Sequence, residues 1–554
     1  MSDTTSKPVD VPGQRASMLA PFRHDTFRIL WLATLASNLG GLVQSVGAGW
    51  MMTTLTDSHN MVALVQASTT LPIMIFSLAA GALADSFDRR IVMLIAQIGM
   101  AMVSLLLAVL AFLGVLSPWL LLGFTFLIGC GTALFNPSWQ ASMGDIVPRQ
   151  DLPGAVTLNA MGFNMMRSVG PAVGGLIVAV LGAAAAFIVN AVSYLALIWA
   201  LARWQPQHAV SILPRERFGS AMWAGLRYVM LSPNLTTVLF RGFLFGFAAV
   251  CILALLPSVA EEYVGGGALV YGTLLGCFGL GAIGGAFLNA RVRARYRNEV
   301  IVRAASVGFA ISCVGLGLSR DLLLSHFVLL PAGACWVLSL SLFNVSVQLS
   351  SPRWVVGRAL SLYQTATFGG MAAGSWCWGS LADASGPDWS LIAAGLVLLL
   401  CALVGLRLPL PQFGNHDLNP LNTFNEPVLR LDLNPRSGPI MVMVDYQIDE
   451  ADVPAFLALM SDRRRIRRRD GARQWAVLRD LERPDIWVES YHVPTWVDYV
   501  RHNLRRTKAD AENFQSLRAL HRGEGPPQVH RMIERQIVPL KEDLVLRDTP
   551  EVSA

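Results

Sequence analysis

Charged side chains are what this sequence has least of. Only 14% of its 554 residues are charged, whereas an average soluble domain carries about 25%. The shortage is uneven, because charges are rare between positions 27 and 408 and dense from Arg430 onward. Hydrophobic residues make up 53% of the chain, which excludes a soluble protein of ordinary composition. The sequence therefore divides into a part suited to lipid and a part suited to water.

Lysine is almost absent as well, so the net charge of +6 comes from arginine. The chain contains only Lys7, Lys508 and Lys541. In a membrane protein the placement of basic residues matters more than their total. We interpret the high arginine content as a general feature of the composition, and no nucleic-acid partner is predicted.

Motifs for metals, disulfides, cofactors and nucleotides are missing too. The seven cysteines lie in apolar runs and none forms a CxxC pair, so neither a disulfide framework nor a metal site is predicted. No GxxxxGK[ST] loop is present, which argues against ATP hydrolysis as the driving force. No cofactor is predicted. The polar N-terminus lacks a cleavable apolar core, so we expect the first apolar run to act as an uncleaved insertion signal.

What the sequence does contain is a series of long apolar runs. A helix needs about 20 apolar residues to cross about 30 Å of hydrocarbon. We predict an all-α polytopic membrane protein with 12 transmembrane helices in two six-helix halves, and a turn at Leu181-Gly182. The runs lie near 27–54, 61–84, 91–114, 118–144, 155–180, 182–202, 236–260, 269–290, 300–319, 322–349, 358–382 and 388–407.

The segments between and after these runs define the remaining domains. A polar stretch between the sixth and seventh runs has the pattern of an amphipathic helix, which predicts a linker along the membrane surface. A Pro/Asn/Asp-rich linker follows the last run. The predicted domains are a cytoplasmic N-terminal tail (1–26), the two halves (27–203 and 236–408) with a linker between them (204–235), a second linker (409–438), a cytoplasmic domain (439–540) and a tail (541–554).

The placement of arginine predicts the orientation in the membrane. If the N-terminus is inside, the outside loops contain only Arg320. This asymmetry predicts an inner (plasma) membrane protein with both termini in the cytoplasm. The inside loops then contain Arg23, Arg89, Arg90, Arg149, Arg203, Arg215, Arg217, Arg227, Arg291, Arg293, Arg295, Arg297, Arg353 and Arg358.

The loop after the second run reads Gly81-Ala-Leu-Ala-Asp85-Ser-Phe-Asp88-Arg89-Arg90. Gly81 permits close helix contact, and Asp85 lies at a helix end within reach of backbone amides and basic side chains. We expect Arg89 and Arg90 to anchor the turn in the lipid headgroups. The alternative is an ordinary charged turn.

The fifth run contains Arg167-Ser-Val-Gly170-Pro171-Ala-Val-Gly174-Gly175. Gly170 and Gly174 form a GxxxG face, and Pro171 is expected to kink the helix. An arginine within a span costs at least ~2.5 kcal/mol on insertion scales, so Arg167 is expected to face the bundle interior or water. The alternative is a motif that serves packing alone.

Other polar residues in the spans are candidates for a central cavity. Arg241 either meets a substrate or a helix dipole, or reaches the cytoplasmic face. Glu261 and Glu262, at the outer end of the seventh run, are the candidate proton site because acidic residues are scarce elsewhere. Many of the amides are expected to serve only as contacts between helices. The candidate cavity lining is Asn38, Gln44, Asn136, Gln140, Asn164, Arg241 and Gln348.

The loop at 81–90 resembles the GxLaDrxGRr signature of the major facilitator superfamily, although Ser86 and Asp88 depart from it. The motif at 170–175 resembles the GPxxGG motif of proton-driven exporters in that superfamily. The resemblance implies alternating access, proton coupling and Asp85 as a latch on the cytoplasmic side. It also implies a cavity lined by the first, fourth, seventh and tenth spans. The equivalent loop of the second half, 284–293, has no Asp.

A narrower resemblance runs through all twelve spans and into the tail. It is to the transmembrane secretion effector branch of the superfamily, which includes the enterobactin exporter, and it implies export of siderophore-like or drug-like molecules. The motifs that carry it are Leu134-Phe-Asn-Pro137-Ser-Trp139-Gln140, Val147-Pro148-Arg149, Leu158-Asn159, and Gln348 with Val356-Gly357-Arg358-Ala-Leu-Ser-Leu-Tyr363-Gln364.

The polar C-terminal region has the pattern of a small α+β domain. We expect strands near 441–448, 474–481, 486–493 and 529–537, and helices near 452–468 and 496–520. The order βαββαβ predicts a ferredoxin-like fold. The region resembles dimeric domains of the antibiotic-biosynthesis monooxygenase type, which implies dimerisation. No catalytic residues are assigned, although a pocket among Tyr446, Trp475, Trp487, His492, Trp496 and His502 is conceivable.

The arginine-rich run at 462–470 is expected to be a solvated face or a contact with anionic lipid. The favoured function is secondary export of small molecules, with the lipid bilayer, a small-molecule substrate and protons as partners. The alternative is a membrane-tethered enzyme or regulator whose C-terminal domain acts on a quinone-like or other small ligand. An importer would differ only in the direction of coupling.

Overall fold

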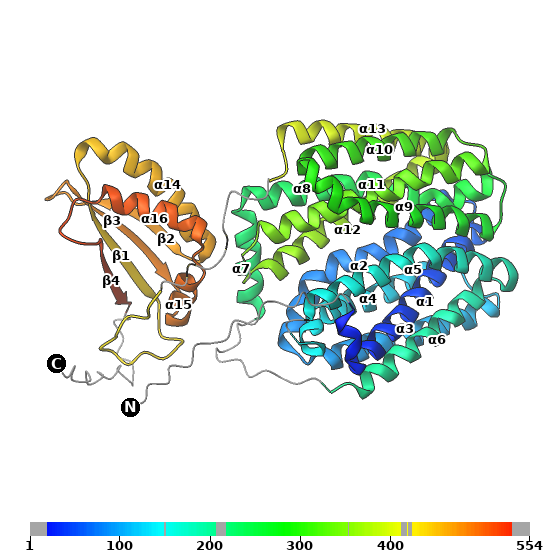
Figure 1. Cartoon of the computed structure of the whole chain (residues 1–554), viewed down its shortest axis with the longest axis horizontal. Helices are drawn as coiled ribbons and strands as arrows, with labels where there is room; N and C mark the ends of the chain where they lie inside the picture. The colour runs from blue at the N-terminus through cyan, green and yellow to red at the C-terminus, as the bar shows by residue number, and fades with distance from the viewer. Residues whose placement is uncertain are drawn as a thin grey trace, which may run out of the picture.

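The computed structural model describes residues 19–148, 151–205, 218–352, 354–411, 418, 421 and 424–534. A long bundle of helices makes up most of the molecule, and a small sheet domain lies beside one end of it (Figure 1). The short helix α7 (Phe218–Met230) lies at that end of the bundle. We call this the near end of the bundle and the opposite one the far end.

Two sets of six helices form the bundle in the described part of the chain, and their bounds lie within a few residues of the predicted runs. The first set is α1 (Asp25–Leu55), α2 (His59–Ser86), α3 (Arg89–Phe112), α4 (Pro118–Ile146), α5 (Leu152–Leu181) and α6 (Ala183–Arg203). The second set is α8 (Pro233–Ser258), α9 (Ala268–Arg295), α10 (Asn298–Leu318), α11 (Leu322–Leu349), α12 (Val356–Ser385) and α13 (Pro387–Arg407). A single π-turn, Val259–Tyr263, extends α8 at the far end.

Within the described residues, 11 of these helices are long and apolar enough to cross a membrane. The predicted number of 12 apolar spans is therefore not matched, because α12 falls short. Its sequence is rich in glycine, serine and threonine, which allow it to pack closely between α2 and α8. A Cβ atom placed on Gly379 of α12 would lie only 2.8 Å from the Cα atom of Asn60 in α2. Small residues thus replace apolar ones where α12 faces protein.

In each set, a glycine separates the last two helices. Gly182, with φ of +81°, separates α5 from α6, and Gly386, with φ of +94°, separates α12 from α13. A residue with a side chain rarely adopts this left-handed backbone conformation, so glycine allows the sharp reversal. The predicted turn at Leu181-Gly182 is confirmed.

The expected linker helix is present as α7. It packs against α8, α12 and the soluble domain: the Tyr228 ring is 2% exposed and meets the Trp354 ring edge-on at 5.4 Å. On the soluble side, the Arg469 guanidinium lies 5.0 Å from the centre of the Tyr228 ring. The linker is therefore a contact between the bundle and the soluble domain, and its placement on a membrane surface stays a prediction.

The soluble domain is a four-stranded antiparallel sheet with helices against it. Its order is β2-β3-β1-β4, with β1 and β3 at the centre, which is the ferredoxin-like arrangement predicted from βαββαβ. Alternate residues of β1 are buried against the helices. The elements are β1 (Ile440–Gln447), α14 (Val453–Asp470), β2 (Arg473–Arg479), β3 (Ile486–Val493), α15 (Trp496–Leu504), α16 (Lys508–Leu520) and β4 (Gln528–Ile533).

Candidate functional site

A cavity of about 120 Å³ lies between the two sets of helices. One wall, from the first set, carries hydrogen-bonding side chains among apolar ones such as Val62 and Ile128, and we call it the polar wall. The opposite wall, from α8 and α9, is mostly apolar and includes Leu253, Pro257 and Leu275. The described residues that line the cavity include no charged side chain. The polar wall contains Gln44, Ser45, Gln66, Thr69, Thr125 and Asn190.

A buried hydrogen-bond network holds the polar wall in place. The Gln44 side-chain oxygen accepts hydrogen bonds from the Asn190 amide at 2.6 Å and from the Ser104 hydroxyl at 2.8 Å. The same Asn190 amide lies 3.2 Å from the Tyr194 hydroxyl. Buried polar groups need such partners, since an unpaired one costs about 1–3 kcal/mol. The network therefore fixes the orientation of the Gln44 amide at the edge of the cavity.

Polar contacts between the two sets close the far end. The Asp383 carboxylate of α12 accepts hydrogen bonds from the Ser58 hydroxyl at 2.9 Å and from the Asn60 backbone N–H at 3.1 Å. These groups begin α2, so the carboxylate meets the positive end of a helix dipole. Beside them, His59 Nε2 lies 3.6 Å from the Glu262 carboxylate. We call these residues the far-end contact.

Helices α5 and α9 also touch toward the far end. A Cβ atom on Gly175 would lie 2.8 Å from the Cα atom of Gly272, and one on Gly279 would lie 2.6 Å from the Cα atom of Ser168. Further toward the near end, a Cβ atom on Gly284 of α9 would meet nothing within 4 Å. Helices α5 and α9 are therefore in close contact from Gly272 to Gly279.

Several other glycines of α5, α9 and α12 pack within their own set of helices. Gly170 and Gly174 pack on α1 of their own set, against Leu42 and Val43. Likewise Gly281 and Gly285 pack on α11, and Gly370 and Gly374 pack on α8. Of the glycines in the α5 motif, Gly175 is the one that meets the other set. Close packing within a set thus also requires small residues.

Arg167 lies half-buried in α5 and faces the other set of helices. Its guanidinium carbon lies 5.7 Å from the centre of the Trp336 ring in α11 and 6.0 Å from that of Phe278 in α9. A guanidinium above aromatic faces is stabilised by the ring quadrupole. Arg167 therefore contacts the second set, as expected for an arginine that avoids lipid.

Arg241 does not line the cavity, which corrects the prediction. Its side chain is 4% exposed, forms an ion pair with Glu299 of α10 and donates a hydrogen bond to the Leu408 carbonyl at 3.3 Å. Glu299 also accepts a hydrogen bond from the Leu410 backbone N–H at 2.8 Å. The pair thus ties the starts of α8 and α10 to the end of α13 at the near end.

The arginines of the 81–90 loop contact protein groups, and their anchoring in lipid headgroups stays a prediction. Arg89 donates to the Asp145 carboxylate at 2.9 Å, and Arg90 donates to the Leu201 carbonyl at 2.9 Å at the end of α6. Asp88 caps α3 by accepting from the Arg90 backbone N–H. The side chain of Asp85 lies outside the described residues, so its latch role stays a prediction.

The remaining candidates are scattered. Asn38 is half-buried, whereas Asn136, Gln140 and Gln348 are exposed and do not line the cavity, and the side chain of Asn164 lies outside the described residues. Glu261 and Glu262 are both exposed on the π-turn, with Glu262 facing His59. Among the predicted lining residues, Gln44 is the one that the structure places at the cavity.

Sequence reasoning missed two sets of partners. It did not identify the pairing of Asp383 with the start of α2, nor that of Glu299 with Arg241. Both are contacts between residues far apart in the chain, so neither has a local pattern. A signal was present for Asp383, because an acidic residue near the end of a long run is a candidate cap for a neighbouring helix.

Solved structures show the fold that this geometry suggests. A bacterial homologue of the human lysosomal transporter Spinster, in an inward-facing and unoccupied conformation, superposes with a TM-score of 0.56 at 15% identity. The match covers 69% of this chain and 96% of that one. At this identity the likeness establishes the fold alone. The helical part of the chain therefore has the same fold as that transporter.

The family follows from the sequence comparison. The transmembrane secretion effector family matches residues 16–537, and the chain belongs to it. Similar proteins include the enterobactin exporter EntS of Escherichia coli O1:K1, 26% identical over 69% of this chain and 93% of that protein. The multidrug efflux pump Tap of Mycolicibacterium fortuitum is 24% identical over 69% of this chain and 95% of its own length. The protein is therefore a multi-span membrane transporter.

Proposed function

We propose that the protein exports small, amphipathic molecules by alternating access, with the cavity beside Gln44 as the binding site. The observation that carries the proposal is the chemistry of its walls, which are hydrogen-bonding on one side and apolar on the other. Siderophore-like and drug-like molecules combine both kinds of surface, and the relatives named as an enterobactin exporter and a multidrug pump agree with that class.

In our proposal, the structure is one state of the alternating-access transport cycle. The volume of about 120 Å³ is smaller than the 300–1,000 Å³ of ordinary small-molecule sites, so the cavity must widen to admit a substrate. The far-end contact supports a state closed at that end. The arginine distribution supports a near end that faces the cytoplasm, with twelve spans, both termini inside and an inner-membrane location.

Coupling to protons is part of the same proposal. The titratable pair His59 and Glu262 lies where the two sets of helices meet at the far end. A proton bound by the Glu262 carboxylate would neutralise it and remove its attraction to His59, which would favour opening toward the outside. The likeness of the soluble domain to monooxygenase-type domains, and a dimer formed through it, stay predictions.

Transport into inverted membrane vesicles tests the function. We expect the wild-type protein to accumulate an amphipathic substrate, such as a catecholate siderophore, when a proton gradient is imposed without ATP. The variant Gln44→Leu should transport about tenfold more slowly, because a hydrogen bond worth ~1–2 kcal/mol is lost at the cavity.

The matched control is Gln97→Leu, which removes a buried side-chain amide from α3. Gln97 does not line the cavity, so its rate should stay within about twofold of the wild type. Equal losses in the two variants would contradict the assignment of the cavity. Absence of gradient-driven transport of any panel compound by the wild-type protein would contradict the function itself.

A further inference from the structure

The soluble domain contains a second cavity, of about 400 Å³, between its sheet and its helices. The floor is formed by the buried face of β1 and β3, including Tyr446 and Tyr491. The walls come from α14, α15 and α16, and include Arg463, Arg506 and Phe514. The volume lies in the ordinary range for small-molecule sites, which is 300–1,000 Å³.

The cavity is lined by arginines that outnumber their acidic partners. Arg467 forms a bidentate pair with Glu489, its Nε and Nη2 atoms lying 3.0 and 3.3 Å from the two carboxylate oxygens. Trp475 donates a third hydrogen bond to Glu489 at 3.0 Å. Burial raises the pKa of Glu489, but the charges of Arg467 and then Arg463 lower it to about 2. One carboxylate is thus already well satisfied by one arginine.

Arg463 is left with unused hydrogen-bond donors. It is 3% exposed, yet its Nε and Nη2 atoms have no hydrogen-bond partner, and its nearest acidic atom is a Glu489 oxygen at 3.5 Å. The Nε atom of Arg506 is also buried without a partner. Burial, and then the charge of Arg467, lower the pKa of Arg506 to about 10, so the group stays charged at neutral pH. Two guanidinium groups therefore face the cavity without a carboxylate of their own.

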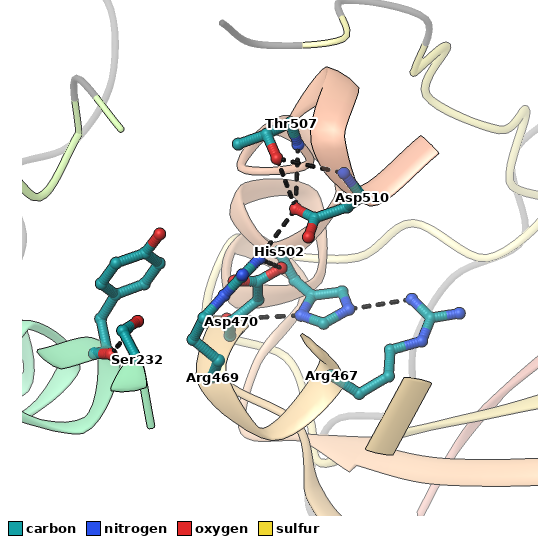
Figure 2. Close-up of polar contacts among 8 residues, drawn as sticks. Ser232, Arg467, Arg469, Asp470, His502, Thr507 and Asp510 are labelled. Atoms are coloured by element: carbon teal, nitrogen blue, oxygen red, sulfur yellow. Dashed lines mark hydrogen bonds and ion pairs between the residues drawn. The ribbon is translucent and has the colours of Figure 1, made fainter. Parts of the chain in front are cut away.

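The nearby His502 adds no charge to the cavity. His502 Nε2 lies 3.0 Å from Arg467, which can only donate, so His502 accepts there and its Nδ1–H donates to the Asp470 carbonyl at 3.3 Å (Figure 2). Burial, and then Arg467, lower the pKa of His502 well below its ordinary value. His502 is therefore neutral and positions Arg467.

Aromatic rings lie against these arginines. The Arg463 guanidinium carbon lies 5.1 Å from the centre of the Phe514 ring, and that of Arg506 lies 5.6 Å from the same ring. Arg467 lies 4.4 Å from the centre of the Tyr491 ring. A planar ligand with an aromatic ring and a carboxylate would match both features: guanidinium groups bind carboxylates through paired hydrogen bonds, and rings stack on aromatic walls.

We propose that this cavity binds an aromatic carboxylate, with its carboxylate between Arg463 and Arg506 and its ring against Phe514. Burying a cation without a partner is costly, so an anionic ligand that satisfies these donors gains binding free energy. The site is separate from the central cavity, whose described lining carries no charge. The two sites therefore take chemically different ligands or different parts of a ligand.

Calorimetric titration of the full-length protein in lipid nanodiscs tests this site with benzoate and 2-naphthoate. We expect one molecule of 2-naphthoate to bind per chain, and the neutral analogue 2-naphthamide to bind at least about tenfold more weakly, which corresponds to about 1.4 kcal/mol. Inorganic phosphate should also bind at least about tenfold more weakly, since it lacks the ring. Equal binding of naphthoate and naphthamide, tighter binding of phosphate, or no binding of either carboxylate would overturn the proposal.

Arg463→Met separates binding from folding. It should weaken 2-naphthoate binding at least about tenfold while the unfolding temperature of the ligand-free protein stays the same or rises, because a buried cation that shares its partner Glu489 with Arg467 is removed. The control Arg465→Met changes an exposed arginine of the same helix that pairs only with Asp462, and should bind normally. Arg506→Met provides a second test if Arg463→Met unfolds. Unchanged affinity in the folded variants, or loss of binding in Gln44→Leu, would contradict the site.

Discussion

The two cavities of this transporter use opposite chemistry. The central cavity is lined by neutral amides, hydroxyls and apolar groups, whereas the soluble cavity is lined by arginines. A charge at the centre of a bilayer costs about 2.5–3.5 kcal/mol on insertion scales, so a site within the spans recognises its ligand most cheaply with neutral hydrogen bonds. In the soluble domain, one buried carboxylate and nearby solvent allow several guanidinium groups to gather. If both proposed sites bind ligands, this contrast in charge would help to distinguish them.

The cavities also differ in what holds their walls. The central one lies between two sets of helices, so its shape depends on how those sets meet. The soluble one lies within a single domain, between a sheet and the helices packed on it. A change at the contact between the sets should therefore affect transport and leave binding in the soluble cavity unaltered.

Gly272→Val is the strongest test of that difference. The new side chain would begin 2.6 Å from the Cα atom of Gly175 and 2.7 Å from the Pro171 carbonyl oxygen, both in the backbone of α5. Overpacking of this kind costs about 1–3 kcal/mol, so we expect the far end to close poorly and transport to fall about a hundredfold. Vesicle transport measures the loss, and 2-naphthoate titration should give the wild-type affinity.

The matched control is Gly284→Val in the same helix. A Cβ atom there meets nothing within 4 Å, so transport should remain close to that of the wild type. Loss of transport in both variants would show that α9 simply tolerates no larger residue. Wild-type transport in Gly272→Val would show that this close approach is not needed for function.

Local patterns predicted the elements of the fold well. Long apolar runs indicated the helices of the bundle to within a few residues, and Gly182 marked the turn between α5 and α6. The change in hydrophobic pattern after the last apolar run indicated the strands of the soluble domain, and their order indicated the ferredoxin-like sheet. These predictions succeed because an apolar run and a glycine at a reversal are properties of neighbouring residues alone.

The site was less predictable because it depends on distant contacts. Gln44 was among the candidates, but its partners Ser104 and Asn190 lie on two other helices. Arg241 was misplaced because its partner, Glu299, is 58 residues away. The prediction of a twelfth apolar span at α12 was also affected, because the small residues of α12 pack against α2 and α8 rather than contact lipid. Which residues face each other follows from packing, which one sequence does not reveal.

Acid should weaken the soluble domain before it affects the central cavity. The folded pKa of Glu489 is about 2 and lies below its ordinary value of 4.5, so the charged form is stabilised by folding. That stability is fully present above pH 4.5 and is lost as the pH falls toward 2, and the shift corresponds to ~3 kcal/mol. Amide hydrogen exchange of β1 and β3 should therefore accelerate in this range.

Glu489→Gln should remove this pH dependence and weaken protection of β1 and β3 already at neutral pH, because Arg467 loses its ionic partner. Glu482→Gln, at an exposed position, provides the control and should behave as the wild type. Protection that changes equally with pH in Glu489→Gln and in the wild type would show that another group is responsible.

The smallest expected effect concerns His59 and Glu262, a titratable pair that joins the two sets of helices at the far end. Glu262→Gln removes the ionic attraction to His59, and an exposed pair of this kind contributes about 0–1 kcal/mol. We therefore expect gradient-driven transport to fall by about threefold and its dependence on outside pH to flatten. Glu261→Gln changes the adjacent exposed residue and should alter neither quantity. If both variants respond to the proton gradient as the wild type does, coupling resides elsewhere, and Asp383, which also joins α2 to α12, becomes the next residue to change.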